Sequence, residues 1–308
     1  MNFNKTLLSF SIIFYVLIYF KFYPLFYSFA DERVYIIQAE SLLKGKLQVP
    51  EWTRGFSIHK GKIGILPKYP PFYSLLFLSL PLKINFYLVF LSSLLVHILS
   101  FFLFYKILKL INIHPLYSLL YLFHPSFVLY SRTIMPDIYV SFLFLFTLYF
   151  HIKKSNFSFF TNFLLSLMKP SSFFYSFVFI IDSFLKKEKK NFVLYIFTTF
   201  LSVSFVYIYL IILHGNPSPY LYFSLSFIFR NFKDYFIYLN LNYPMLLIFG
   251  FLGILRIKIL RGILLGFIPS LMLYLLYIFH DLVESSLLLS SVIGLRYLLP
   301  FLTLLIMG

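Results

Sequence analysis

The chain has 308 residues, of which 61% are hydrophobic and only 12% are charged. A soluble domain carries about 25% charged residues, so this composition excludes a water-soluble globular protein and predicts an integral membrane protein. Cysteine is absent, which excludes disulfides, thiolate nucleophiles and cysteine metal sites. The net charge of +16 does not indicate a nucleic-acid partner, because the basic residues occur in short clusters between apolar segments, as is typical of cytoplasmic loops.

Ten apolar segments follow one another along the chain, and a spanning helix needs about 20 such residues or somewhat fewer. We therefore predict an all-α, polytopic transmembrane helical bundle of about 9–11 spans, formed as a single domain over residues 1–308. His-Pro and Lys-Pro pairs within 114–131 and 157–185 predict short or broken helices there. The expected spans are 6–29, 85–108, 114–131, 136–152, 157–169, 170–185, 191–213, 243–256, 261–279 and 286–306.

The first apolar segment has two interpretations. Lys5 gives it a positive start, and Ser28-Phe29-Ala30 fits a signal-peptide cleavage site. The apolar stretch is long, however, and Lys21 and Pro24 interrupt it. We expect a retained first helix.

The distribution of charge predicts which ends of the helices face the cytoplasm. We predict a protein of the cell membrane whose N-terminus is cytoplasmic. Every loop on the cytoplasmic side is then basic, in accord with the positive-inside rule. Two longer polar loops, 30–70 and 214–242, then lie outside. The expected inside residues are Lys5, Lys106, Lys109, Lys153, Lys154, Lys186, Lys187, Lys189, Lys190, Arg256, Lys258 and Arg261. Most acidic residues fall outside: Asp31, Glu32, Glu40, Glu51, Asp137, Asp234, Asp281 and Glu284. Carboxylates gathered on the external face indicate chemistry there.

The first loop opens with DERVYIIQAESLLKG, whose apolar residues recur at helical spacing up to Gly45. This pattern predicts an amphipathic helix on the external membrane surface. Asp31 has two interpretations: it caps the helix N-terminus, or it is a carboxylate poised as a general base. Glu32 stands beside it.

Four further motifs carry ionisable residues near the external face. Lys68 in LPKYPPFYSLLF either snorkels or binds a phosphate. In SRTIMPDIY, Arg132 and Asp137 form an ion pair that pins a turn, or supply a phosphate-binding arginine and a second acid. Lys169 lies in MKPSS, which we expect to form an external break between two short helices. Arg296 in RYLLPFL lies inside an apolar span. An ionisable residue in such a span is by default a candidate functional residue.

Taken in order, these motifs resemble the GT-C glycosyltransferases, polytopic enzymes that use lipid-phosphate sugar donors. The similarity is greatest to the protein O-mannosyltransferase and aminoarabinose transferase branch. It rests on DERVYIIQAESLLKG, PKYPPFYSLLF, SRTIMPDIYVSFLF and RYLLPFL, which cover most of the chain. Two features depart from the family pattern: Tyr69 separates Lys68 from the proline pair, and family members are commonly longer. The resemblance therefore implies a minimal or inactive member, or one whose C-terminal part is missing.

The resemblance implies inverting transfer from a polyprenyl-phosphate sugar to the hydroxyl of a glycan, lipid or protein acceptor at the external face. It implies Asp31 as the base and Glu32 as its support. Asp137 then orients Arg132 or binds the acceptor. The implied ligands of the donor phosphate are Lys68, Arg132 and Arg296. Some GT-C enzymes use a divalent metal, but no ligand set in this sequence demands one, and His59 stands alone in its loop.

Two other classes compete with this reading. A transporter or lipid flippase also places ionisable residues at membrane depth and often has broken helices, which fits Arg296 and the interrupted segments. A non-catalytic membrane scaffold would carry all of its charges at the interface. The acidic residues gathered outside favour the transferase.

Overall fold

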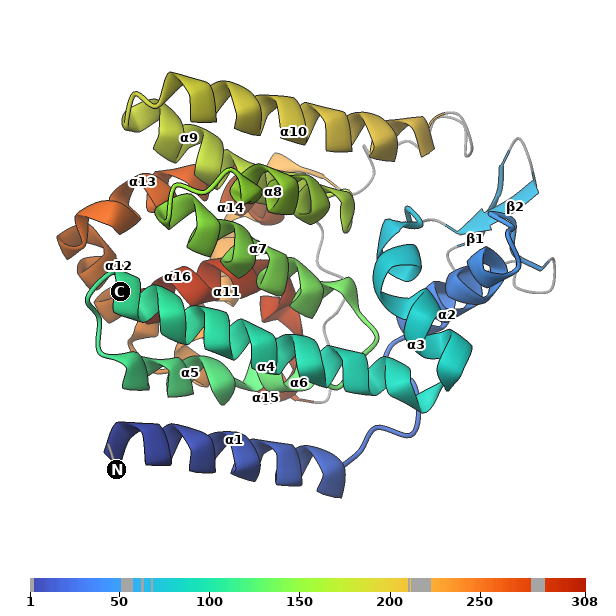
Figure 1. The fold of residues 1–308 in the computed structure, drawn as a ribbon, viewed down its shortest axis with the longest axis horizontal. Helices are drawn as coiled ribbons and strands as arrows, with labels where there is room; N and C mark the ends of the chain where they lie inside the picture. The colour runs from blue at the N-terminus through green and yellow to red at the C-terminus, as the bar shows by residue number, and fades with distance from the viewer. Residues whose placement is uncertain are drawn as a thin grey trace.

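The computed structural model describes residues 3–50, 58–61, 64–67, 69–209, 211, 223–277 and 286–308, and within them it is a helical bundle with one small antiparallel hairpin (Figure 1). The first half contains α1 (Phe3–Lys21), α2 (Ala30–Leu43), β1 (Ile58–Gly61), β2 (Gly64–Pro67), the π-helical turn η2 (Ser74–Leu78), α3 (Ser79–Ile84), α4 (Tyr87–Leu110), η3 (Pro115–Tyr117), α5 (Ser118–Leu122), α6 (Pro125–Tyr130) and α7 (Pro136–Ile152). The predicted all-α class is confirmed apart from this hairpin.

The described residues of the second half form helices and the turns that connect them, with a single bridge between Phe223 and Tyr277. It contains α8 (Phe157–Leu167), η4 (Ser172–Ser176), α9 (Phe177–Leu185), α10 (Lys189–Ile208), η7 (Leu225–Phe227), α11 (Ile228–Asn242), α12 (Leu246–Arg256), α13 (Lys258–Gly266), α14 (Ile268–Leu276), α15 (Leu287–Gly294), η8 (Leu295–Leu298) and α16 (Leu299–Met307). The predicted interruptions within 114–131 and 157–185 are confirmed.

Four helices of the described residues are long and apolar enough to cross a membrane, and a fifth span results if one bent pair is counted. The four are Tyr87–Leu110, Lys189–Ile208, Lys258–Leu276 and Leu287–Met307. The bent pair, Leu225–Asn242 and Leu246–Arg256, turns through 93°. These helices support an integral membrane protein. Five shorter apolar helices accompany them. The expected first span 6–29 is shorter than predicted, since α1 ends at Lys21, before Pro24.

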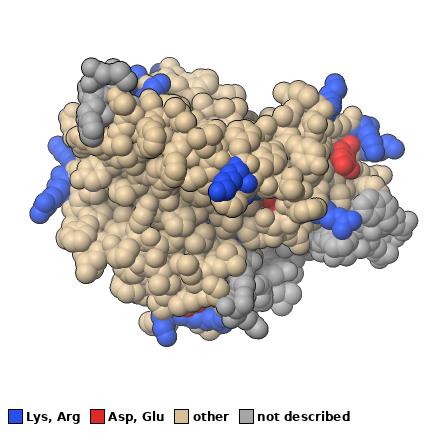
Figure 2. All heavy atoms as spheres, turned by 90° about the horizontal axis from the view of Figure 1, so that it is seen from below, with Lys and Arg blue, Asp and Glu red and all other residues tan. Residues whose placement is uncertain are grey.

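The bundle is built around α7, which packs against α4, α8 and α16 (Figure 1). Most of its residues are buried, including Tyr139, Phe144 and Leu145. The outward-facing surface is apolar instead of charged: Phe10, Phe200 and Phe249 are among many exposed hydrophobic side chains. Figure 2 shows one such face, in which neither basic nor acidic residues cover the greater part of the surface. Such an apolar surface supports an integral membrane protein.

The basic residues collect at one end of the bundle, which we call the basic end. Successive long helices run in opposite directions, so the end of α4 and the turns α7–α8, α9–α10 and α12–α13 all lie at the left of Figure 1. The basic end carries exposed side chains of Lys106, Lys109, Lys153, Lys154, Lys186, Lys187, Lys189, Lys190, Arg256, Lys258 and Arg261. The opposite end carries α2 and the hairpin. Of the residues assigned to the outside, Glu51, Lys68, Asp281 and Glu284 lie outside the described residues.

Helix α2 occupies almost the predicted range, but it is buried on two faces instead of one. Tyr35, Ile36 and Ala39 belong to the main core, while Val34 and Ile37 form a small second cluster with Val49. The helix packs against η2 and α3. Its burial corrects the expectation of a simple amphipathic surface helix and makes α2 a structural part of its end of the bundle.

Candidate functional site

The ion pair between Asp137 and Lys169 lies at the end opposite the basic residues. Asp137 is the second residue of α7, directly after Pro136, and Lys169 lies between α8 and η4, where Pro170 interrupts the helix. The Lys169 Nζ lies 2.6 Å from Asp137 Oδ1, with side chains only 13% and 3% exposed. Burial lowers the pKa of Lys169, but the Asp137 carboxylate more than offsets this, so that the pKa is raised and the ammonium stays charged.

Arg296 approaches this ion pair from the C-terminal part of the chain. It sits in η8, the short turn that joins α15 to α16. Its guanidinium lies 4.5 Å from the ring centre of Tyr297, and Lys169 Nζ lies 5.5 Å from the same ring. Both cations therefore lie beside the ring of Tyr297, and the charge of Arg296 lowers the pKa of Lys169.

Asp31 is linked to the site by two tyrosines, Tyr35 in α2 and Tyr69 in the segment after the hairpin. The Asp31 carboxylate is half-buried at the start of α2. Burial raises the pKa of the Tyr69 hydroxyl, the charge of Asp31 and its hydrogen bond to this hydroxyl raise it further, and Arg296 opposes the rise. Tyr69 is held by stacking on Tyr35, with ring centres 4.9 Å apart, and by Gln38, whose Nε2 donates to its carbonyl at 2.9 Å.

The pKa of Tyr35 responds to the charges of several residues of the site. Its pKa is raised well above the ordinary value, first by burial, then by the charges of Tyr69, Asp31 and Asp137, while Arg296 opposes them. Asp31 at the start of α2, Asp137 at the start of α7 and Arg296 in η8 are far apart in the chain, yet the charge of each affects the pKa of Tyr35. The site thus combines two carboxylates with two cations, Lys169 and Arg296.

Glu32 is fully buried and binds backbone instead of facing the site. Its Oε2 accepts from the N–H of Phe29 at 2.8 Å and from Ser28, and its Oε1 accepts from the N–H of Ile134. Phe29 is the N-cap of α2, so Glu32 caps the helix from its third position, and Asp31 is not the cap. Burial raises the pKa of Glu32, and the three backbone donors oppose this rise. Glu32 joins the start of α2 to the turn before α7.

We expect Glu32→Gln to lower the free energy of unfolding by about 1–3 kcal/mol. Either orientation of the new amide places its NH₂ group against at least one of the three backbone N–H donors, which leaves a buried donor unsatisfied. The measurement is denaturant unfolding in detergent. Glu40→Gln is the matched control, because Glu40 is exposed on the same helix. Equal stability of the two variants would contradict the role of Glu32 as a clamp, that is, as the residue that joins the start of α2 to the turn before α7.

Two other residues proposed from the sequence are placed differently. Arg132 lies over the ring of Tyr19 in α1, at 5.6 Å, so its described contact is toward α1, and the ion-pair partner of Asp137 is Lys169. An Arg132–Asp137 ion pair is therefore not what pins this turn. Lys68 lies outside the described residues, and the side chain of His59 does as well.

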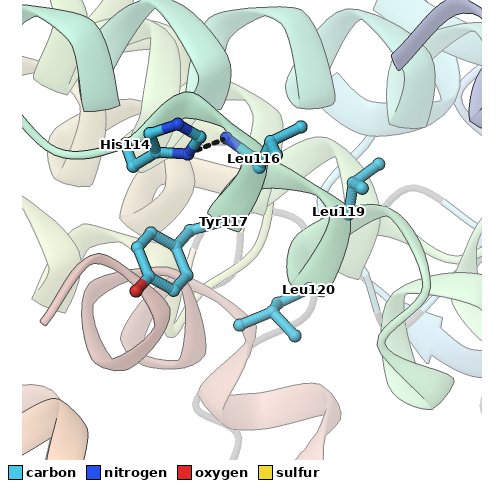
Figure 3. A pocket seen from close by; sticks show the side chains of 5 residues that line it. All are labelled: His114, Leu116, Tyr117, Leu119 and Leu120. Carbon is cyan, nitrogen blue, oxygen red and sulfur yellow. Dashed lines mark hydrogen bonds between the residues drawn. The ribbon is translucent and has the colours of Figure 1, made fainter. Parts of the chain in front are cut away.

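The described residues contain no group of three or more His, Cys, Asp or Glu side chains that could hold a metal ion. A cavity of about 370 Å³ lies elsewhere, lined by His114, Leu116, Tyr117, Leu119 and Leu120 (Figure 3). The His114 Nδ1 is already used, since it accepts the N–H of Leu116 at 3.4 Å (Figure 3). This cavity is apolar and gathers none of the ionisable residues proposed for chemistry.

Sequence reasoning left two residues out of the site. The helix break that contains Lys169 was predicted, but Lys169 was given no role, although a lysine beside Pro170 at the same end as Asp137 was a usable signal. Tyr69 was noted only as a departure from the family pattern. Its contact with Asp31 depends on the packing of the segment after the hairpin onto α2.

The chain was compared with protein-family models, with curated proteins and with solved structures, and none of the three comparisons found a match.

Proposed function

We propose that this protein is a membrane glycosyltransferase that moves a sugar from a polyprenyl-phosphate donor to an acceptor hydroxyl, with inversion at the anomeric carbon. One observation carries the proposal: at one end of an apolar bundle, Lys169, paired with Asp137 at 2.6 Å, and Arg296 lie beside the same Tyr297 ring. In the proposed arrangement that end is external, the shorter apolar helices also cross the bilayer, and the chain makes about ten crossings.

In this mechanism Asp31 is the general base. Its carboxylate takes the proton of the acceptor hydroxyl as the oxygen attacks the anomeric carbon, and the bond from that carbon to the phosphate oxygen breaks. Polyprenyl phosphate leaves with the bonding electron pair. The half-buried position of Asp31 at the end of the bundle supports this role, whereas Glu32 is occupied by backbone N–H groups.

Lys169 and Arg296 are the proposed ligands of the leaving phosphate. Two cations beside one aromatic ring stabilise the negative charge that grows on the leaving oxygen. Asp137 holds Lys169 at 2.6 Å and so fixes its position. The residues of the chain account for proton removal and phosphate binding; the sugar and the acceptor are left unassigned.

Transfer by the purified chain in a bilayer is the direct test of this function. Given radiolabelled polyprenyl-phosphate sugars and a mixture of glycan, lipid and peptide acceptors, the wild-type protein should release polyprenyl phosphate and label one acceptor. Release of polyprenyl phosphate without an acceptor would indicate hydrolysis only. Neither product from any donor would overturn the proposal.

Arg296→Ala should weaken binding of polyprenyl phosphate by about 10- to 150-fold, the equivalent of about 1.5–3 kcal/mol for a charge-assisted contact. Arg132→Ala is the matched comparison, because Arg132 lies against Tyr19 instead of Tyr297. Binding is measured with a fluorescent polyprenyl phosphate in detergent. If Arg132→Ala weakens binding as much, the phosphate site extends to the α1 side of the bundle.

The proposed orientation places the basic end in the cytoplasm. Because the chain has no cysteine, Lys46→Cys and Lys187→Cys each create a single thiol at an exposed position near opposite ends. In intact cells an impermeant maleimide should label Lys46→Cys only, and Lys187→Cys should react only after lysis. The reverse result would put the candidate site in the cytoplasm and remove the external donor from the mechanism.

A transporter or lipid flippase is the second candidate, and the 93° bend between α11 and α12 favours it. Broken helices of this kind surround substrate sites in many transporters. A flippase would move a fluorescent polyprenyl phosphate across a proteoliposome membrane without any sugar transfer. Translocation that survives Asp31→Asn would favour this candidate over the transferase.

A further inference from the structure

The basic end carries a patch of six lysines, formed by the turns α7–α8 and α9–α10. The patch consists of Lys153, Lys154, Lys186, Lys187, Lys189 and Lys190, all exposed. The two turns lie beside each other at the left of Figure 1, and the ion pair between Lys154 Nζ and Glu188 Oε1, at 3.2 Å, joins them. No part of the proposed transfer reaction uses these residues.

The acidic residues near the patch are already occupied. Asp182 is 1% exposed and is held by Lys186 at 2.5 Å and by His151 Nε2 at 2.7 Å. Glu188 is held by Lys154 and by Asn191, whose Nδ2 donates to its Oε2 at 2.7 Å. Among the ion pairs of the described residues, none includes Lys187, Lys189 or Lys190. The positive charge of the patch is therefore presented outward.

Large apolar side chains border the lysines. Phe184 is 64% exposed and Leu185 is 49% exposed directly before Lys186, and Val193 is 60% exposed one turn after Lys189. A soluble anion would bring no partner for these side chains. A lipid surface would meet both parts, because acyl chains cover the apolar residues and phosphates meet the lysines.

Two of these lysines also hold a backbone conformation that side chains other than Gly, Asn and Asp rarely adopt. Lys154 has φ 54° and Lys187 has φ 57°, both in the left-handed region. Glycine would fit these turns with less strain. A lysine at both positions is consistent with selection for charge at the expense of backbone stability.

We propose that this lysine patch binds the phosphate head groups of anionic phospholipids in the adjoining leaflet. The proposal depends on the chain lying in a membrane and not on the transfer reaction. Each lysine near an anionic surface contributes about fivefold in affinity, and the attraction is strongly reduced in about 1 M salt, where the screening length is about 3 Å.

The test uses the full chain in nanodiscs of phosphatidylcholine alone or with phosphatidylglycerol added. Phosphatidylglycerol should raise the unfolding temperature of the wild type, and high salt should remove most of this increase. Lys187→Gly with Lys189→Ser and Lys190→Ser should bind a fluorescent phosphatidylglycerol about 100-fold more weakly. Lys44→Ser with Lys46→Ser, two exposed lysines at the opposite end, should stay within about twofold of the wild type.

The single variant Lys187→Gly is the control for a folding defect in the triple variant. It relieves the left-handed backbone, so in phosphatidylcholine it should be at least as stable as the wild type while losing about fivefold in phosphatidylglycerol affinity. Unchanged affinity in the triple variant would overturn the proposal. So would a stability increase of the same size produced by inorganic phosphate without anionic lipid, because the patch would then be a site for free phosphate.

Discussion

Asp31→Asn is expected to fold, to bind polyprenyl phosphate as the wild type does, and to lose about 10²–10⁴-fold in the rate of sugar transfer, the usual share of acid–base catalysis. Asparagine has nearly the same shape but cannot take up a proton from the acceptor hydroxyl. The cap of α2 is Phe29, with Glu32 supplying the capping carboxylate, so the substitution leaves helix capping intact. Single-turnover transfer with saturating donor is the measurement.

The design separates chemistry from folding. Glu40→Gln removes an exposed carboxylate from the same helix and should transfer at the wild-type rate. Melting curves of both variants should overlay that of the wild type. A folded Asp31→Asn variant with full activity would show that the base is another residue, and Asp137 would be the next candidate because it is the other carboxylate of the candidate site.

Asp137→Asn is expected to destabilise the protein by about 3–5 kcal/mol, because it leaves the ammonium of Lys169 buried without its counter-charge. Denaturant unfolding in detergent measures the loss. Removing both charges, as Asp137→Asn with Lys169→Met, should restore most of the stability, since a buried ion pair is often replaceable by uncharged side chains of similar size.

Ligand binding gives this prediction a second readout. If Lys169 holds the donor phosphate, polyprenyl phosphate supplies an anion to the uncompensated ammonium and should stabilise Asp137→Asn more than the wild type. The double variant should show the smallest stabilisation by the ligand. Identical ligand effects in all three proteins would place the phosphate away from Lys169.

The helices were predictable where apolar runs are long and uninterrupted. The expected span 85–108 became α4 at Tyr87–Leu110, and 286–306 became the helix Leu287–Met307. Pattern alone failed near polar interruptions: the first span was drawn through Lys21 and Pro24, although α1 stops at Lys21. The second face of α2 could not be predicted, because it is covered by Val49 together with Ile65 of the hairpin and Tyr69, whose placement depends on tertiary packing.

The site was only partly predictable, for a similar reason. Asp31, Asp137 and Arg296 could be proposed from the sequence because ionisable residues near apolar helix ends are few. The sequence could not show that Glu32 binds backbone N–H groups while Asp31 does not cap the helix. That difference depends on which carboxylate accepts the N–H of Ile134, a residue about 100 positions away. Pairing Asp137 with Lys169 instead of Arg132 likewise needed the packing of α7 against α8.

The clamp formed by Glu32 has a consequence for how the energy of substrate binding is used. It fixes the α2 start, which carries Asp31, to the Ile134 turn, and three residues later Asp137 fixes Lys169. In the proposed mechanism the base and the cation are therefore preorganised on one continuous frame, and the entropy of bringing them together is lost during folding instead of during each turnover. Loosening the Glu32 contact of this frame should reduce the transfer rate while leaving donor affinity nearly unchanged, because Lys169 and Arg296 stay in place.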